Sequence, residues 1–284
     1  MSFFSRSLYP SYFAKKPYHN TAIVSDDSSN SSTSPSDNIW CHDTLVPQNR
    51  DCLRVLSKKE YKRVGWTLSL AFARDPLTHY LVACPDLKNC SEESLWNLHK
   101  YMLTCIASYY LLIGKTFCIG PDYNSIALWV LPGTTHDERW SILRSGLWRL
   151  QYKLSSEGRR RYYTEVVPKL DRLKQKIMGK RDGDCYYLVY LATKPSCQGK
   201  GYGSKLIQHM IQQADDEGKP MYLESSSPSN TKYYQKFGFV PKENIRFGPD
   251  ASILLTAMVR EPKVRVSSTS GLSSLELKNT NEST

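Results

Sequence analysis

The sequence predicts an α/β fold in which helices flank a sheet, and three observations support this prediction. An aromatic and β-branched run at 185–190 leads through a glycine-rich turn into an amphipathic helix that begins near residue 202. Further segments with strand and helix patterns alternate before and after this unit. The part between two polar tails, roughly 220 residues, is long enough for one domain with a sizeable core.

The chain before the glycine-rich turn is expected to supply two helices and a hairpin. A strand at 51–56 precedes Ser57 and Glu60, whose spacing is typical of a capping box at the start of a helix. That helix is predicted to stop near residues 75–76, with a loop at 75–90 and a second helix that ends at Gly114. The hairpin is predicted from strands at 117–119 and 125–130.

A long helical insertion, at 136–181, is expected before the central strand. It carries much of the excess positive charge, but its apolar spacing indicates an amphipathic helix with a solvated basic face. A strand at 221–226 and a short helix at 231–237 are predicted after the turn. Strands that begin at 239 and 253 complete the order.

The glycine-rich turn predicts a phosphate site. A strand that passes through glycines into a helix N-terminus directs several backbone N–H groups toward one spot at the positive end of the helix dipole. Glycine allows close approach of a ligand and positive φ angles. The spacing of Gly199, Gly201 and Gly203 fits neither the Walker loop nor the G-x-G-x-x-G dinucleotide fingerprint.

A second pattern follows thirty residues later, with Asn230, Tyr234, Gly238 and Phe239 as its fixed positions. Together with Gln198-x-x-Gly201-x-Gly203, it resembles the two signatures of the GCN5-related N-acetyltransferase (GNAT) superfamily. The stretches 198–204 and 223–230 are further similar to puromycin N-acetyltransferase and related enzymes. The resemblance covers residues 50–260.

The resemblance implies a mixed, mostly antiparallel sheet flanked by helices, with the insertion before its central strand. It also implies acetyl-CoA as co-substrate. Pantetheine would lie along the strand before the loop, with the pyrophosphate on the loop itself. The cofactor-binding residues expected on this basis are Leu191, Ala192, Thr193, Gln198, Gly199, Lys200, Gly201, Tyr202, Gly203, Ser204 and Asn230. For Asn230, the alternative is a helix N-cap.

Acetyl transfer to an amine needs a base for the ammonium proton and an acid for the departing thiolate. The resemblance assigns the acid to Tyr234, whose alternative is ordinary core packing beside Phe237. Glu224 is the predicted base, because strand alternation puts it on one side with Tyr222, where it could face the cleft. The alternative is a solvated strand glutamate.

The acceptor site is the least determined part of the prediction. In such folds the first two helices and their loop wall it, here with Phe72, Asp75, His79 and Tyr80, and Trp129 is a further candidate from the sheet. The leading hypothesis is an enzyme that acetylates a small-molecule primary amine by direct attack in a ternary complex. A protein or histone lysine acetyltransferase and a non-catalytic acyl-CoA sensor are the alternatives.

Composition narrows the partners. The eight cysteines form no C-x-x-C pair, so neither a zinc site nor any other metal is expected, and a reducing compartment fits them best. The net charge of +11 permits nucleic-acid binding, but no nucleic-acid partner is expected. No apolar run reaches membrane-spanning length, so no membrane partner is expected either.

Three segments are expected along the chain. Residues 1–48 and 263–284 are polar tails that should be disordered, and 49–262 form the acetyltransferase domain, as a monomer or homodimer. A cytoplasmic location is the leading expectation. The first 24 residues have no acidic side chain, which is compatible with a mitochondrial presequence, although a plain disordered tail is the favoured interpretation.

Overall fold

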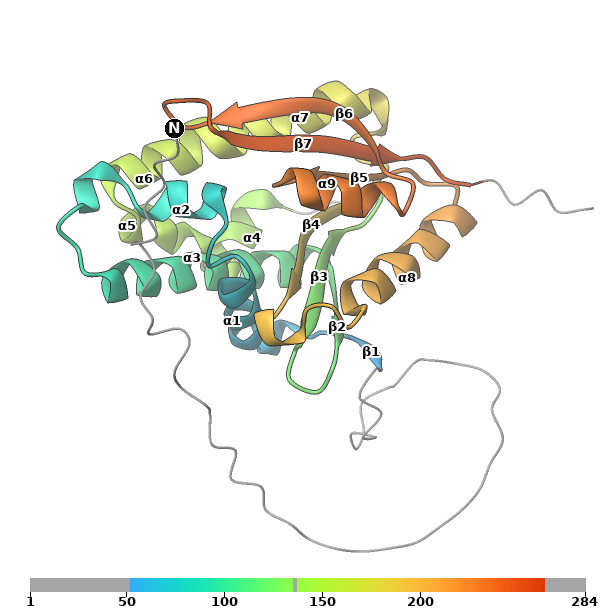
Figure 1. The fold of residues 1–284 in the computed structure, drawn as a ribbon, viewed down its shortest axis with the longest axis horizontal. Coiled ribbons are helices and arrows are strands. Elements are labelled where there is room, and N and C mark those ends of the chain that lie inside the picture. The colour runs from blue at the N-terminus through green and yellow to red at the C-terminus, as the bar shows by residue number, and fades with distance from the viewer. Residues whose placement is uncertain (1–51, 135–136, 264–284) are drawn as a thin grey trace, which may run out of the picture.

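A seven-stranded sheet in the order β1-β2-β3-β4-β5-β7-β6 forms the centre of the protein (Figure 1). The computed structural model describes residues 52–134 and 137–263, so the predicted tails fall almost entirely outside the described residues. The strands are β1 (Leu53–Val55), β2 (Lys115–Ile119), β3 (Ser125–Val130), β4 (Tyr186–Thr193), β5 (Met221–Ser225), β6 (Val240–Phe247) and β7 (Ile253–Arg260). All neighbours are antiparallel except β4 and β5, which confirms the mixed, mostly antiparallel sheet.

The first helical region differs from the prediction at one point. A 3₁₀ turn η2 (Lys58–Glu60) and α1 (Tyr61–Ala71) follow the capping box at Ser57, and α3 (Glu92–Ile113) ends at Gly114 as predicted. The expected loop at 75–90 instead contains α2 (Pro76–Val82) and the 3₁₀ turn η3 (Pro85–Leu87). The Asp75 carboxylate accepts a hydrogen bond of 2.9 Å from the Thr78 N–H and so caps α2.

The predicted helical insertion is confirmed. Its order is α4 (Glu138–Ser145), η4 (Leu147–Arg149), α5 (Leu150–Lys153), α6 (Ser156–Arg160), the π-helical segment η5 (Arg161–Val166), α7 (Val167–Met178) and η6 (Gly179–Arg181). Leu173 and Met178 of α7 are buried against Tyr222 of β5 and Val259 of β7, so the apolar stripe of this helix faces the sheet. Most basic residues of the insertion are exposed, whereas Arg161 is buried and the half-buried Lys174 reaches over the Tyr187 ring of β4.

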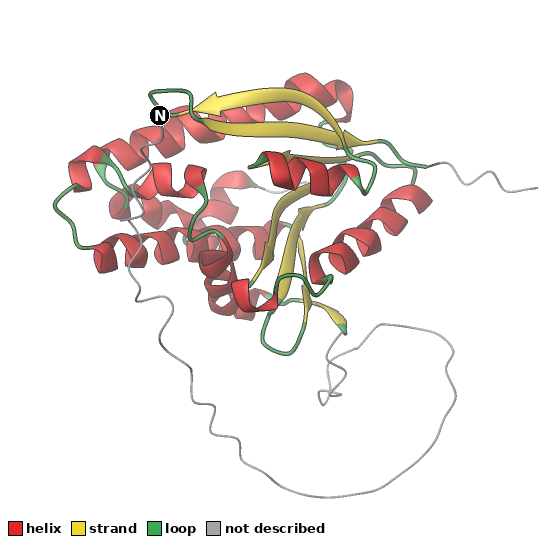
Figure 2. Cartoon of the chain, in the orientation of Figure 1, coloured by secondary structure: helices red, strands yellow, loops and turns green. Residues whose placement is uncertain are grey.

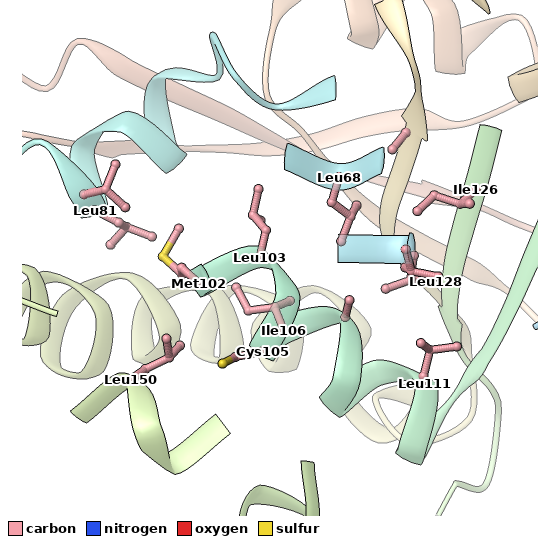
Figure 3. Packing of buried hydrophobic residues seen from close by; sticks show 14 of the residues in the cluster. Leu68, Leu81, Met102, Leu103, Cys105, Ile106, Leu111, Ile126, Leu128 and Leu150 are labelled. Carbon is pink, nitrogen blue, oxygen red and sulfur yellow. The ribbon is translucent and has the colours of Figure 1, made fainter. Parts of the chain in front are cut away.

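The glycine-rich turn holds a 3₁₀ turn η7 (Pro195–Cys197) and leads into α8 (Tyr202–Asp216), while α9 (Pro228–Gln235) follows β5. Helices therefore cover both faces of the sheet (Figure 2). On one face α8 buries Leu206, Ile207 and Met210 completely, each worth about 1.5–3 kcal/mol of burial free energy. On the other face α1 and α3 form a second cluster with Ile126 and Leu128 of β3 (Figure 3).

The parallel pair β4–β5 is short, and this opens the sheet. The pairing runs from Tyr186↔Met221 to Leu188↔Leu223, and within the described residues no further pair joins the two strands. β4 continues to Thr193 with β3 as its neighbour, after a bulge opposite Leu128 and Trp129 that bends it. The backbone of the second half of β4 is consequently free of strand pairing on its β5 side. No helix among the described residues has the length and apolar content to cross a membrane.

Candidate active site

The turn between β4 and α8 has the backbone of an anion-binding loop. Gly199 and Gly201 adopt φ angles of 78° and 76°, a region that costs a side-chain-bearing residue about 1–2 kcal/mol. Gly201 is the N-cap of α8, so the first N–H groups of that helix lie next to the loop without intrahelical acceptors. The Gln198 amide donates to the Thr193 carbonyl at 3.4 Å and draws the loop together.

Gly203 serves a different purpose from the other two glycines. Its φ is not positive, but a Cβ atom built on it would lie 3.1 Å from the Tyr233 hydroxyl. That hydroxyl also lies 3.2 Å from Ser204 Oγ. Gly203 thus lets the first turn of α8 pack closely on Tyr233 of α9. The positive φ predicted for the glycines is present at Gly199 and Gly201, while at Gly203 the missing side chain makes room for a neighbouring helix.

A cavity of about 640 Å³ lies over this loop, within the size range of ligand sites. The sequence-predicted residues that line it are Leu191, Thr193, Gln198, Gly199, Lys200, Gly201, Tyr202, Gly203, Ser204 and Asn230. Ala192 does not line it, because its side chain points to the opposite face of the sheet and is buried in the α1–α3 cluster. Arg74 and Lys200 bring positive charge to the lining, and Asp75 is the one acidic side chain among the described lining residues.

A second cavity of about 180 Å³ adjoins the first on the side of α2, α3 and the insertion. Both cavities are lined in part by the same residues, which are Phe72, Asp75, Leu191, Ser226, Asn230 and Tyr234. The remaining wall of the second cavity consists mainly of apolar and aromatic side chains, with Glu224 among them. The two cavities meet where β4 and β5 separate.

Tyr234 lies at the junction of the two cavities. Its ring also packs against Tyr233 and Phe239, at centroid distances of 5.5 and 6.0 Å. Burial raises the pKa of Tyr234 well above its usual value, and Tyr233 raises it slightly further. The hydroxyl is therefore protonated at neutral pH and is available as a proton donor.

Glu224 faces the second cavity from β5. Its Oε2 accepts a hydrogen bond of 2.9 Å from the Tyr187 hydroxyl, while its Oε1 is buried and makes no hydrogen bond within the described part of the chain. Burial raises the pKa of Glu224 to about 7, against the opposing effect of the hydroxyls of Tyr187 and Tyr222. Near neutral pH this carboxyl is divided between its two protonation states.

Asn230 does not cap α9, so the alternative role predicted for it is wrong. Ser227 is the N-cap, and its hydroxyl accepts a hydrogen bond of 3.2 Å from the Asn230 N–H. Asn230 stands in the first turn of the helix, with an exposed side chain that lines both cavities.

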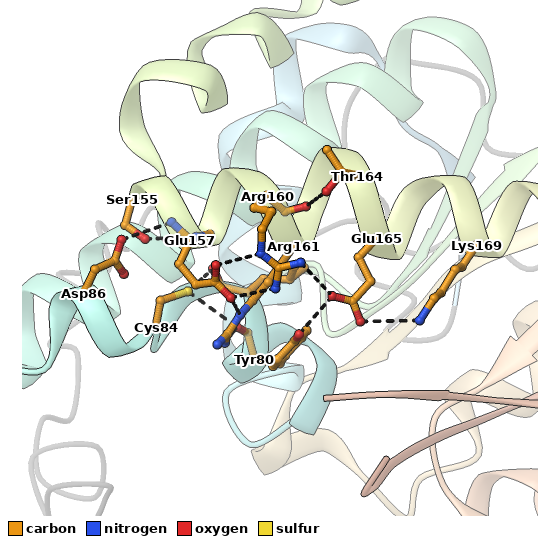
Figure 4. Close-up of polar contacts among 12 residues, drawn as sticks. Tyr80, Cys84, Asp86, Ser155, Glu157, Arg160, Arg161, Thr164, Glu165 and Lys169 are labelled. Carbon is orange, nitrogen blue, oxygen red and sulfur yellow. Dashed lines mark hydrogen bonds and ion pairs between the residues drawn. The ribbon is translucent and has the colours of Figure 1, made fainter. Parts of the chain in front are cut away.

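The acceptor-wall candidates separate into two groups. Phe72 and Asp75 line both cavities, whereas Trp129 is fully buried on the opposite face of the sheet beside α8. His79 is exposed and lines neither cavity. Tyr80 is likewise outside both linings and binds the insertion through Glu165 and Arg161 (Figure 4).

Sequence analysis missed the tyrosines of the second cavity. These are Tyr110 of α3, Tyr162 of η5, and Tyr187 and Tyr190 of β4. Tyr110, Tyr187 and Tyr190 belong to apolar runs that indicate core, Tyr162 follows three arginines, and the sequence contains no spacing that would group the four. Among the described residues, no three histidine, cysteine or acidic side chains are arranged to hold a metal ion.

The opened parallel pair, the glycine loop at a helix N-terminus and the joined cavities define the class of acyl-CoA-dependent acetyltransferases. A model of the acetyltransferase (GNAT) family matches residues 163–239, the stretch that contains β4, the loop, α8, β5 and α9. An uncharacterised N-acetyltransferase of Schizosaccharomyces pombe is 39% identical over 206 residues, which are 72% of this chain and 81% of the yeast protein. The chain belongs to the GNAT family and is an N-acetyltransferase.

Solved structures with a similar course of the chain include an arylalkylamine N-acetyltransferase from Aedes aegypti. It is 18% identical, with a TM-score of 0.49, and the match covers 74% of this chain and 98% of that one. A histone acetyltransferase-related protein from Corynebacterium glutamicum is 23% identical, with a TM-score of 0.46, over 76% of this chain and 99% of that one.

Proposed function

We propose that the protein transfers the acetyl group of acetyl-CoA to the primary amine of a small molecule, by direct attack in a ternary complex. The observation that carries this proposal is the junction of the two cavities, where Tyr234 borders both and Glu224 faces the second. One cavity has the backbone features of a phosphate site, and the other has a carboxyl group in an apolar wall.

The first cavity suits acetyl-CoA. The loop and the N-terminus of α8 would hold the pyrophosphate, with Lys200 and Arg74 as nearby positive charges. The backbone of Leu191, Ala192 and Thr193, which has no strand partner on the β5 side, would hydrogen-bond the pantetheine arm. Ala192 contributes through its main chain alone, since its side chain lies in the core.

The proposed chemistry divides the two protons between two residues. Glu224 accepts a proton from the ammonium group, directly or through water, and the neutral amine then attacks the thioester carbonyl. The C–N bond forms, the C–S bond breaks, and Tyr234 donates its proton to the departing thiolate. The second proton lost by the nitrogen restores the Tyr234 hydroxyl, so the products are the amide, the CoA thiol and one proton held on Glu224. A Glu224 pKa of about 7 allows this carboxyl to take up a proton at neutral pH and to release it again.

Direct attack is favoured because both substrates would meet at the junction. The described residues shared by the two cavities include no cysteine that could carry the acetyl group as a thioester. An oriented amine beside the thioester needs no covalent enzyme intermediate.

The size of the second cavity favours a small acceptor over a protein chain. At about 180 Å³, it has room for a compact group, while a peptide substrate would need an extended groove beside it. The placement of Tyr234 at the junction and of Glu224 in the second cavity also favours catalysis over a non-catalytic acyl-CoA sensor, because a sensor would not need an acid and a base there.

Thiol release from acetyl-CoA, measured with panels of small amines and histone peptides, tests the proposal. We expect release that depends on a small amine, and the panel should include puromycin because of the resemblance in sequence. Release with histone peptides alone would establish the protein acetyltransferase alternative. Tight CoA binding without release for any amine would establish the sensor.

A further inference from the structure

We infer that the acceptor is a primary amine carried on one compact apolar group, best an aromatic ring, and that the π-helical segment of the insertion sets its size limit. This inference rests on the proposed function and names the substrate class of the same site. It depends on the volume, the wall and the charge of the second cavity.

The volume corresponds to one ring. An apolar protein cavity of about 150 Å³ is known to bind benzene. The second cavity, at about 180 Å³ and joined to the first, therefore accommodates a phenyl group with a short linker and leaves less room for a fused bicyclic group. A polyamine would place a second charged amine inside this apolar cavity, which is unfavourable.

The wall is apolar and aromatic. Met102 and Ile106 of α3, Leu170 of α7 and Leu255 of β7 line it, together with the tyrosines named above. Phe72 and Tyr190 meet edge-to-face at 5.2 Å, an arrangement that a further ring can extend. No lysine or arginine occurs among the described lining residues. An aromatic group would be favoured here over a charged or strongly polar one.

Negative charge marks the position of the amine. Asp75 and Glu224 are the acidic lining residues, and Asp75 stands at the junction with the first cavity. Glu224 Oε1 is buried without a hydrogen bond in the described residues, and a bound ammonium group would give it a donor in competition with the nearby Tyr222 hydroxyl and Lys174. An arylalkylamine would satisfy both requirements, with its ring in the apolar wall and its nitrogen near these carboxylates.

The insertion supplies part of the wall of the second cavity and none of the wall of the first. Tyr162 and Val166 belong to η5, and Leu170 follows in α7. η5 is held to α2, because Arg161 donates at 2.8 Å to the Tyr80 carbonyl, while a second bond of 2.8 Å to Glu157 Oε1 fixes the same guanidinium group to α6 (Figure 4). A π-helical turn held in this way keeps the Tyr162 ring at a fixed place. Tyr162 is accordingly the residue that we assign as the determinant of acceptor size.

The first experiment compares acceptors with the full-length protein and acetyl-CoA. Phenethylamine should have a kcat/KM at least about tenfold higher than spermidine or a lysine peptide, the scale of one well-filled apolar contact. A thiol-release assay gives these ratios. Acetylation of spermidine or the peptide in preference to phenethylamine would overturn the inference, while acetyl transfer itself would stand.

The second experiment enlarges the cavity. Tyr162→Ala should raise the ratio of kcat/KM for tryptamine over phenethylamine by roughly tenfold or more, because the removed ring makes room for the bicyclic group. Leu170→Ala provides a second enlargement if the first variant does not fold. Tyr152→Ala is the matched control, because the Tyr152 ring on α5 is largely exposed and lines neither cavity. An unchanged ratio in folded Tyr162→Ala and Leu170→Ala would refute the role of the insertion.

A binding measurement separates this inference from the proposed function. Phenethylamine titrated calorimetrically into the protein saturated with CoA should bind, and spermidine should bind more weakly. Absence of thiol release with every amine would contradict the proposed function, yet the titration would still decide whether the cavity takes an aromatic amine. No binding of phenethylamine would overturn the inference.

Discussion

The guanidinium group of Arg161 lies over the ring of Tyr80, 4.0 Å from its centroid, and donates to the backbone carbonyl of the same residue. Two elements far apart in the sequence are thereby joined, α2 after the first helix and η5 in the insertion. The Tyr80 hydroxyl adds a hydrogen bond of 3.1 Å to Glu165. Neither Arg161 nor Tyr80 lines a cavity, so we regard them as positioning residues for the acceptor wall.

Arg161→Met should loosen this wall without affecting the CoA cavity. The methionine keeps the volume but leaves the part-buried Tyr80 carbonyl with only the weak Cys84 thiol contact at 3.7 Å, which should cost about 1–3 kcal/mol of unfolding free energy. KM for the acceptor should rise while CoA affinity is retained. Denaturant unfolding, steady-state kinetics and calorimetry measure the three quantities. Arg160→Met is the control, since Arg160 bonds the same Glu157 from an exposed position and should change them little.

Gly201→Asp should weaken CoA binding by tenfold to a hundredfold, the scale of about 1.4–2.8 kcal/mol of repulsion between the new carboxylate and a phosphate. Gly133→Asp is a matched control. Gly133 also has positive φ, 67°, and open space around its Cβ position, so it bears the same backbone cost away from the loop. Calorimetric titration with CoA distinguishes the two variants. Equal affinities would contradict the assignment of the loop to the phosphate groups.

Tyr234→Phe should lower kcat by roughly 10²–10⁴, the usual contribution of a general acid, and should retain CoA affinity. The ring and its packing on Phe239 remain. Tyr233→Phe should behave differently, because it removes a hydroxyl that contacts Ser204 at the start of α8 and should act on CoA affinity. Single-turnover kinetics with saturating CoA separates the two effects. Full turnover in Tyr234→Phe would mean that Tyr234 contributes packing and does not act as the acid.

Glu224→Gln should remove the acidic limb of the pH–rate profile. In the wild-type protein the carboxyl loses its function as a base when it is protonated below a pKa of about 7. Ionisation of the amine produces a similar limb, so the acceptor for this experiment needs a low ammonium pKa. If the acidic limb persisted in the variant, Glu224 would not be the base, and water or the substrate itself would have that role.

Glu224 should also make the unfolding free energy depend on pH, in a direction that its pKa determines. Its pKa is raised in the folded protein to about 7 from 4.5, so the folded state binds more protons between these values, and stability falls as pH rises through them. Because Glu224 retains some exposure to the cavity, the change is on the order of 2 kcal/mol. The unfolding free energy of Glu224→Gln, compared with that of the wild type at the same pH, should therefore be higher at about pH 8 than at about pH 4.

Glu217→Gln serves as the control of opposite sign. The hydrogen bond from Tyr186 lowers the pKa of Glu217, so this residue stabilises the protein above its unfolded pKa, and that contribution is lost as pH falls. Its replacement should cost stability at the higher pH. Thermal unfolding of the two variants and the wild type is measured at both pH values. If the two variants changed Tm in the same direction and by the same amount between these pH values, the burial of the Glu224 charge would be contradicted.

The sequence predicted the structure best where residue type and residue spacing indicate the same local conformation. Three glycines between a strand and a helix predicted the loop, and two of them have the positive φ angles that glycine favours. The hairpin and the insertion followed from periodicity and turn residues, whereas the mixed, mostly antiparallel sheet was implied by the resemblance. The predicted roles of Glu224 and Tyr234 remain proposals, although both residues face the joined cavities.

The errors have physical causes. Asp75-Pro76 was interpreted as the end of a helix, but an N-cap followed by proline is equally the start of one, and α2 begins there. Trp129 alternates to the opposite face of β3 from the acceptor wall. The tyrosine-lined cavity could not be predicted, because it depends on how α3, η5 and β4 come together and not on spacing along the chain.

The early end of the β4–β5 pairing also has a consequence for the lifetime of the protein. Main-chain groups between Tyr190 and Thr193 are left to be satisfied by something other than a strand, and pantetheine is the proposed partner. A ligand that completes the sheet binds the native state alone, so it shifts the folding equilibrium by mass action. At a hundred times its Kd it adds about 2.7 kcal/mol. Abundance of the enzyme would then follow the supply of its own acetyl donor.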